Sequence, residues 1–322
     1  MEEKQYYKEK RISSSSLKYL EQSPLTFKKF LDSEIEQEEK SYLTRGKQIH
    51  MAILEPDLFK KNYTHLEFET PKSEQQKQFC DDYLLYLSTE QSEDEALGTA
   101  YKNNYKSAKS DPLVEANALK DKLTKYIEYL QKRRQYKDIL STTDWQRIQD
   151  LKEGCKKHKK ANELLFEDEL STRQFFNELV IFWEDPIHKL PCKSMIDRLI
   201  IDDDNKKVIL VDIKTANTFK EFKDRCREFS YFRQMSFYWY AIHWYFANAL
   251  NKDISQYTKE TYIIALKTVD EPEVKVYTIN EVYLQDGFID LTEALSQLAW
   301  HWENDKWEYT KSYYIGDGDE KL

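Results

Sequence analysis

The chain has 322 residues, of which 40% are hydrophobic and 33% charged, and its formal net charge at pH 7 is -9. This composition can build one large domain or two modest ones, and its acidity argues against a protein that coats nucleic acid through charge alone. Four widely spaced cysteines without a CxxC pair disfavour a zinc ribbon and fit a reducing compartment. Neither a signal peptide nor a membrane-spanning run is visible, so we expect a cytoplasmic protein with no membrane partner.

Helices are predicted in the first part of the chain, residues 1–70. Serines at positions 13–16 offer N-caps for a short helix, and Ser23-Pro24 begins another. A third helix is predicted over residues 44–54, where His50 lies beside an apolar stripe. By default such a histidine is a satisfied core residue, although it could instead donate its imidazole to a metal ion.

Residues 71–170 are polar and are also predicted to be helical. Apolar residues at three- and four-residue spacing mark amphipathic segments within 79–87 and 119–130. Two basic runs, 132–134 and 156–160, are typical of solvated helix faces, and they could also neutralise DNA phosphates. We assign this block as a helical insertion, although the sequence does not distinguish it from a separate subdomain.

From residue 171 to residue 322 the pattern changes, and alternation of apolar and polar residues predicts a sheet. Three closely spaced strands should form a meander. A long aromatic-rich helix follows, then two further strands and a last helix. The predicted strands are 175–184, 193–201, 207–215, 261–266 and 274–279, and the predicted helices are 229–250 and 280–304.

The most informative segment is the third predicted strand, whose apolar residues 208–211 lead to Asp212 and Lys214. Side chains two apart on a strand share a face, so this acid and this amine should point into one cleft. Asp197 ends the preceding strand, and a hairpin would set it beside Asp212. Two close carboxylates repel unless a cation lies between them, and carboxylate oxygens suit Mg²⁺ or Mn²⁺.

Each short motif has a plainer explanation. The acid-x-Lys pattern recurs at Glu273-x-Lys275, so chance can produce it in so charged a chain. Gln234 and Tyr238 share one face of the aromatic helix and are either a surface pair or groups that hydrogen-bond a phosphate or a water. Glu178 is either a strand acid facing solvent or a third carboxylate in the cleft.

Taken together and in order, these motifs resemble the PD-(D/E)XK nucleases of the RecB-like branch, and within it the exodeoxyribonuclease VIII (RecE-type) group of phages and prophages. The resemblance covers an N-terminal helix pair, a histidine motif and a core. The residues that carry it are 13–18, Ser23-Pro24-x-x-Phe27, Gly46-Lys47-Gln48-Ile49-His50, Phe176-Asn177-Glu178, Ile196-Asp197-Arg198, Val211-Asp212-Ile213-Lys214-Thr215 and Tyr231-x-x-Gln234-x-x-x-Tyr238.

The resemblance implies an α/β (α+β) fold with a restriction-endonuclease-like core, in which helices flank a mixed central sheet. It also implies a Mg²⁺ or Mn²⁺ site. It assigns the metal ligands to His50, Asp197, Asp212 and the carbonyl of Ile213. It assigns catalytic roles to Asp197, Asp212, Lys214, Glu178, Gln234 and Tyr238. Lys214 would orient the attacking water and help to deprotonate it, and Glu178 would support the metal.

Two departures from the family pattern matter. Some relatives carry an iron–sulfur cluster held by cysteines, but this chain has Ser23 at the first such position and no cysteine after Cys226, so we predict no cluster. Many relatives place a basic residue two before the first acid, where this chain has Met195. Lys193 or Arg198 is therefore expected to contact the DNA phosphate instead.

The resemblance implies a metal-dependent exonuclease that digests duplex DNA ends, 5′ to 3′, and exposes single strands for recombination in a bacterial cytoplasm. A single-strand annealing protein would be a natural partner, and a homo-oligomeric ring is compatible with processive relatives. Two alternatives remain open. One is a structure-specific or defence endonuclease of the same fold, and the other is a catalytically inactive DNA-binding protein.

Overall fold

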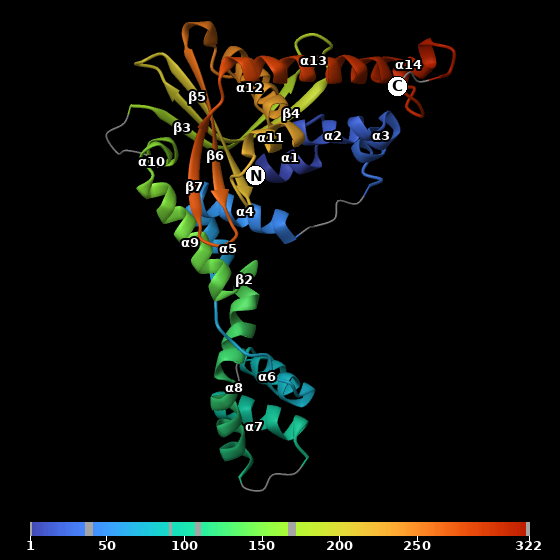
Figure 1. The fold of residues 1–322 in the computed structure, drawn as a ribbon. Coiled ribbons are helices and arrows are strands. Elements are labelled where there is room, and N and C mark those ends of the chain that lie inside the picture. Colours follow the sequence, from blue (N-terminus) through green and yellow to red (C-terminus); the bar gives the residue numbers. More distant parts are fainter. Residues whose placement is uncertain (1, 36–40, 90–91, 107–110, 167–171, 320–322) are drawn as a thin grey trace. The chain divides into compact units, whose positions relative to one another are not determined.

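In the computed structural model, the described residues are 2–35, 41–89, 92–106, 111–166 and 172–319 (Figure 1). The chain divides into two compact units. Residues 1–55 with 150–322 form what we call the sheet unit, and residues 56–149 form the helical unit. Within the described part of the chain, no helix combines the length and the apolar character needed to cross a membrane.

The sheet unit is built on five strands in the order β3-β4-β5-β6-β7 (Figure 1). The strands are β3 (Gln174–Glu184), β4 (Pro191–Asp202), β5 (Lys207–Ala216), β6 (Thr258–Lys267) and β7 (Glu273–Thr278). β3, β4 and β5 form the antiparallel meander that the sequence predicts, β5 and β6 are parallel, and β7 is antiparallel to β6. The sheet is therefore mixed, and the predicted fold class is confirmed.

A parallel strand pair needs a long crossover connection, and helices supply it between β5 and β6. These are α11 (Phe222–Glu228), α12 (Tyr231–Asn248) and the short η2 (Ile254–Gln256). The other helices of this unit are α1 (Glu2–Lys8), η1 (Ser14–Ser16), α2 (Leu17–Gln22), α3 (Pro24–Leu31), α4 (Ser41–Leu54), α10 (Lys159–Leu165), α13 (Glu281–Asn304) and α14 (Lys311–Ile315), while α9 (Thr142–Lys157) begins in the helical unit.

Helix α12 is the main packing partner of the sheet because it is apolar on most of its surface. Its Phe237 ring meets Trp183 of β3 edge-to-face, with 4.8 Å between ring centroids. Trp239 is 2% exposed, and its indole N–H donates to the Thr261 hydroxyl of β6 at 2.9 Å. A buried indole thus keeps its hydrogen bond, and α12 is fixed against strands on both sides of the site described below.

Helices α12 and α13 approach each other closely at Gly287. A Cβ atom on this residue would lie 2.3 Å from the backbone oxygen of Phe232. One turn along α12, the hydroxyl of Ser236 lies 3.0 Å from the backbone oxygen of Leu284 and donates across the same contact. The lack of a side chain at position 287 therefore lets the two backbones touch.

The helical unit has its own small core. Its elements are α5 (Pro56–Asn62), β1 (Tyr63–His65), α6 (Glu74–Leu87), α7 (Glu93–Asn104), α8 (Pro112–Gln135), β2 (Asp138–Leu140) and the start of α9. α6, α7 and α8 pack around buried residues such as Phe79, Leu97 and Ile127. β1 and β2 form a short parallel pair. This pair is not predicted, because residues 1–70 and 71–170 are both expected to be helical.

The four cysteines are all reduced and buried. Burial raises the pKa of Cys80 and of Cys155 to about 12 and that of Cys226 to about 11. These thiols therefore stay protonated at neutral pH, as expected for structural cysteines.

Candidate active site

Strands β4 and β5 separate where their two aspartates face each other. Their pairing runs from Asp202 and Lys207 to Arg198 and Val211, and it ends there. The next residue on each strand is an aspartate. Beyond this point β4 stays paired with β3 and β5 stays paired with β6. The separation opens the sheet locally and leaves backbone groups of both strands free for other partners.

Asp197 turns into this opening and is fixed by the neighbouring strand. Its Oδ2 accepts the backbone N–H of Ile213 at 2.7 Å, in place of a ladder hydrogen bond. The same oxygen lies 3.6 Å from Nδ1 of His50, which α4 supplies. At the end of that helix, the backbone oxygen of Leu54 accepts the side-chain amide of Asn177 from β3 at 2.6 Å. The histidine and the first aspartate are therefore brought together by three separate elements.

Glu178 joins this group through a local distortion of β3. It stands opposite Asp197, but the two are not paired, although the residues on either side of them are. The φ angle of Glu178 is 47°, in the left-handed region, where a non-glycine residue in a strand is strained. One carboxylate oxygen of Glu178, one imidazole nitrogen of His50 and one oxygen of Asp197 all lie within 4.8 Å of one another.

Asp212 and Lys214 occupy the same face of β5. The Asp212 side chain is fully buried, and Nζ of Lys214 lies 2.6 Å from its Oδ2. Apart from this ion pair, no described residue offers the carboxylate a well-aligned hydrogen-bond donor. Burial raises the pKa of Asp212 to about 6, and the nearby charge of Asp197 adds to the increase. A buried carboxylate with unused acceptor positions costs free energy unless a bound cation also interacts with it.

The donor set fits a divalent cation. Carboxylate oxygens with one imidazole nitrogen suit Mg²⁺ or Mn²⁺, and Asp212 has unused acceptor capacity. Burial lowers the pKa of His50 to about 4, so its ring is neutral and able to act as a ligand. The N–H and C=O groups of one strand residue point to the same edge, so the Ile213 carbonyl also faces the opening beside His50.

We expect metal binding to weaken steeply below about pH 6. The raised pKa of Asp212, about 6, means that the protein must lose a proton to bind the cation at lower pH, at a cost of about tenfold in apparent affinity per pH unit. Above about pH 7 the affinity should level off, because His50 is already neutral. Calorimetric titration with Mn²⁺ between pH 5 and 8 measures this profile. A flat profile, or one that Asp212→Asn leaves unchanged, would contradict it.

Gln234 and Tyr238 lie on the face of α12 that meets the acids. The Gln234 amide donates to the Tyr238 hydroxyl at 2.8 Å. Burial raises the pKa of Tyr238 well above its ordinary value, and Asp212 and Asp197 add to this increase. The phenol therefore keeps its proton beside the carboxylates. Tyr231, the first residue of the same motif, also reaches the site, although no role is predicted for it: its ring centroid lies 4.9 Å from Nζ of Lys214.

Lys193 and Arg198, which we expected to contact DNA phosphate, have other partners. Nζ of Lys193 donates to the backbone oxygens of Tyr6 and Glu9, each at 2.7 Å, and so ties the N-terminal segment to β4. Arg198 is 1% exposed, and its Nη1 donates to Asn177 Oδ1 at 2.7 Å. Because a buried guanidinium cannot reach a DNA phosphate, the expectation for Arg198 does not fit the structure, and the Lys193 ammonium is already engaged.

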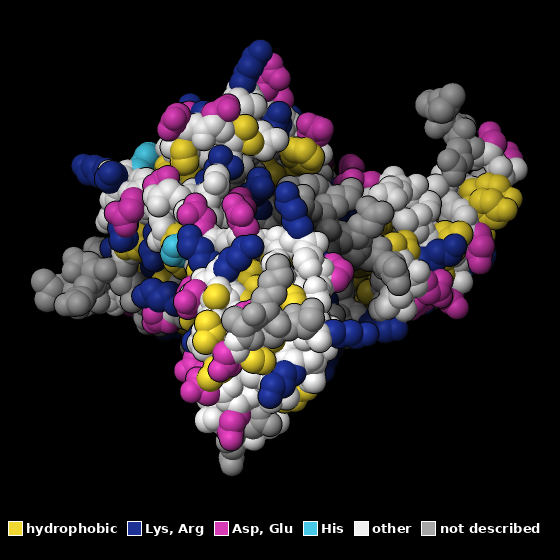
Figure 2. Space-filling model, turned by 90° about the horizontal axis from the view of Figure 1, so that it is seen from below, with side chains coloured by type: hydrophobic (Ala, Val, Ile, Leu, Met, Phe, Trp, Pro, Cys, Tyr) yellow, Lys and Arg dark blue, Asp and Glu magenta, His cyan; other side chains and the backbone are white. Residues whose placement is uncertain are grey.

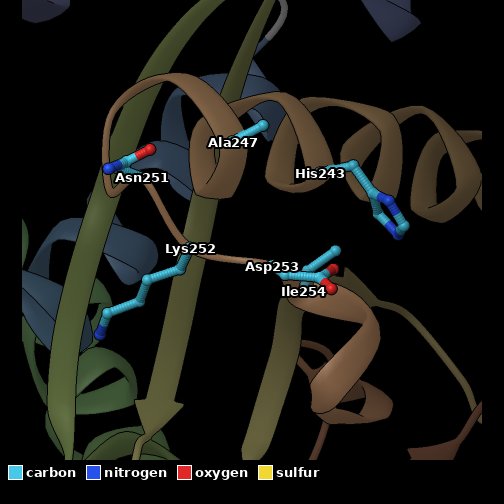
Figure 3. Close-up of a pocket in the computed structure, with 6 residues that line it drawn as sticks. All are labelled: His243, Ala247, Asn251, Lys252, Asp253 and Ile254. Carbon is cyan, nitrogen blue, oxygen red and sulfur yellow. The ribbon is translucent and has the colours of Figure 1, made fainter.

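A surface cavity of about 460 Å³ lies elsewhere, between α12 and η2 (Figure 3). It is lined by His243, Ala247, Asn251, Lys252, Asp253 and Ile254. Figure 3 shows the imidazole of His243 turned toward Asp253 and Ile254, and Lys252 turned away. None of the residues that meet at the separation of β4 and β5 lines this cavity, so it is distinct from the candidate active site.

Comparisons with known proteins identify a family for this chain. A family model described as a PDDEXK-like domain of unknown function (DUF3799) matches residues 13–311. Among curated proteins there is no match. One solved structure, described as a "Putative exonuclease" from Eubacterium rectale, is 12% identical, with a TM-score of 0.38 and coverage of 89% of this chain and 95% of that one.

Proposed function

Because this chain belongs to the PDDEXK-like domain family, we propose that it is a divalent-metal-dependent nuclease that hydrolyses phosphodiester bonds of DNA. The observation that carries the proposal is the meeting of His50, Asp197 and Glu178 at the point where β4 and β5 separate. On β5, at the same separation, Asp212 and Lys214 form a buried ion pair. A purely structural core gains little from gathering so many ionisable groups at one place.

The cation would polarise the scissile phosphate and stabilise the charge that develops there. Side chains of the protein would position the water and the phosphate. Burial lowers the pKa of Lys214 but Asp212 and Asp197 raise it, and the net effect is an increase. Lys214 therefore keeps its proton and acts as a hydrogen-bond donor to a water or phosphate oxygen, which favours an orienting role over that of a base. Tyr238, also protonated, offers a second group beside the acids.

The more specific part of the proposal is that the enzyme acts on duplex ends as an exonuclease of the exodeoxyribonuclease VIII type, from 5′ to 3′. It rests on the sequence motifs that resemble that group. Exposed single strands would then feed recombination, with a single-strand annealing protein as partner and a ring of identical subunits as the processive form. A bacterial cytoplasm, in a host or prophage setting, is the corresponding location.

The surface charge favours local DNA contacts over a large basic face. The chain carries 49 Lys and Arg residues against 58 Asp and Glu residues. Figure 2 shows side chains of both signs interspersed over one face of the molecule. Such a surface gives little general attraction to nucleic acid, so affinity should come from a few residues close to the site and should show a shallow dependence on salt.

The test compares linear with covalently closed circular duplex DNA of the same sequence, in Mg²⁺ and in Mn²⁺. We expect linear DNA to be digested from its ends and closed circles to survive. End-labelled substrates then give the direction of digestion. Nicking of closed circles would replace the exonuclease with an endonuclease. If neither form is cut with either ion, the proposed nuclease activity is wrong.

A further inference from the structure

The connection from β5 to α12 carries an exposed aromatic ring close to the candidate catalytic lysine. Phe229 is 56% exposed, whereas every other phenylalanine of the sheet unit is buried or half-buried. Its ring centroid lies 5.9 Å from that of Tyr231, and the two rings are tilted by 32°. The Tyr231 ring in turn lies 4.9 Å from Nζ of Lys214. Two aromatic rings therefore lead from the surface to the candidate active site.

The backbone holds this arrangement in place. Helix α11 is bracketed by two residues in the left-handed region, Glu221 with φ 56° and Ser230 with φ 55°. The inner face of α11 is anchored by Phe222, which stacks on Tyr277 with 4.6 Å between centroids. Because α11 is anchored on one side and the chain turns sharply at Ser230, Phe229 is directed outward at a cost in backbone strain.

Helix α11 also carries basic side chains. Lys223 and Arg227 lie against the Tyr283 ring, at 5.0 Å and 5.7 Å from its centroid. The Arg225 charge lies close enough to Tyr231 to act against the burial that raises the pKa of that phenol. Among the described residues Arg225 forms no salt bridge, whereas Arg227 of the same helix pairs with Asp224. An aromatic surface beside an available guanidinium is the combination that binds the bases and phosphates of single-stranded nucleic acid.

We propose that Phe229 and Tyr231 form a stacking platform for an unpaired base of the DNA strand that enters the site, and that Arg225 contacts a phosphate of that strand. This inference rests on the proposed nuclease function and adds to it the form of the substrate, a single-stranded segment next to the bond to be cut. A fully paired duplex offers no free base face, so duplex DNA would have to open by at least one pair at the platform.

The test separates base contacts from phosphate contacts. Binding is measured by fluorescence anisotropy in Ca²⁺, with a labelled 12-nucleotide oligothymidylate and with a 12-mer of abasic residues that keeps the phosphates. Wild-type protein should bind the oligothymidylate about tenfold or more tightly than the abasic strand, as expected for one or two stacked bases. Phe229→Ala should remove most of this difference by weakening only the binding of the oligothymidylate, and Phe229→Trp should restore it.

Two further variants complete the design. Arg225→Ala should weaken both strands equally and reduce the salt dependence, because a phosphate contact does not depend on the base. Tyr309→Ala is the matched control: Tyr309 is 51% exposed and stacks on Tyr313 of α14, a helix that lies apart from α11 in Figure 1. It should bind both strands as the wild type does.

The outcomes distinguish this inference from the proposed function. If wild-type protein degrades DNA but Phe229→Ala discriminates between the two strands as well as the wild type does, the platform is wrong and the nuclease function stands. If wild-type protein cuts no DNA and binds neither strand, the proposed function and the platform are both wrong. Equal binding of the two strands by the wild type would also overturn the platform, whatever the nuclease activity.

Discussion

Lys214→Ala is expected to reduce the rate of DNA cleavage by about a thousandfold, with a much smaller change in DNA affinity. The ammonium lies 2.6 Å from a fully buried carboxylate, so it is held in one position beside the candidate metal site. Losing a positioned donor in such surroundings typically costs between about a hundredfold and ten-thousandfold. Initial rates on linear duplex DNA, with binding measured in parallel, give both quantities.

The matched control uses the same local pattern elsewhere in the same sheet. Glu273-x-Lys275 also places an acid and a lysine two apart on a strand, and Lys275 packs over the ring of Phe219 at 4.8 Å. Lys275→Ala should leave the cleavage rate within about twofold of the wild type, since an exposed surface substitution changes little. A Lys214→Ala protein that is folded and cuts DNA at a rate close to that of the wild type would remove this lysine from the site.

Gly287→Ala is expected to destabilise the sheet unit by about 3 kcal/mol or more, which corresponds to a fall in Tm of roughly 6–12 °C for a unit of this size. The added Cβ would lie 2.3 Å from the backbone oxygen and 2.4 Å from the carbonyl carbon of Phe232. Backbone atoms cannot move aside as a flexible side chain can, so α13 must shift away from α12. Circular dichroism during thermal unfolding measures the change.

Gly98→Ala is the control for this substitution. Gly98 lies in α7, and a Cβ there would have no heavy atom within 4 Å. Alanine should therefore stabilise that helix by about 0.5–1 kcal/mol, which is the usual difference between the two residues inside a helix. If Gly287→Ala unfolds at the wild-type temperature, the close approach of α12 and α13 is not present in solution.

The sheet could be predicted well because the alternation of apolar and polar residues along a strand depends only on residues that are neighbours in the sequence. Alternation placed Asp212 and Lys214 on one face of a strand, and the structure has them in contact. The predicted hairpin places Asp197 beside Asp212. In the structure, the pairing of β4 and β5 ends where these two residues face each other. The distortion at Glu178 was not predictable, because a left-handed φ at a strand glutamate depends on the strands around it.

Contacts between distant segments were harder to predict. Helix α1 is formed, and Lys193 of β4 donates to the backbone at Tyr6 and Glu9, a contact across more than 180 residues that no local pattern indicates. Helix α11 was missed because its seven residues are too few for a clear apolar period. Arg198 looked like a DNA contact in sequence because nothing local indicates that its guanidinium is buried.

The shielded thiols have a practical consequence for studying the two units. Because all four native cysteines are buried and protonated, maleimide reagents should react slowly with the unmodified protein. Val114 in the helical unit and Val282 in the sheet unit are 62% and 65% exposed, so a cysteine introduced at each would be readily labelled. A donor and an acceptor dye on these two positions would report, by energy transfer, how the units are placed in solution and whether DNA changes that distance.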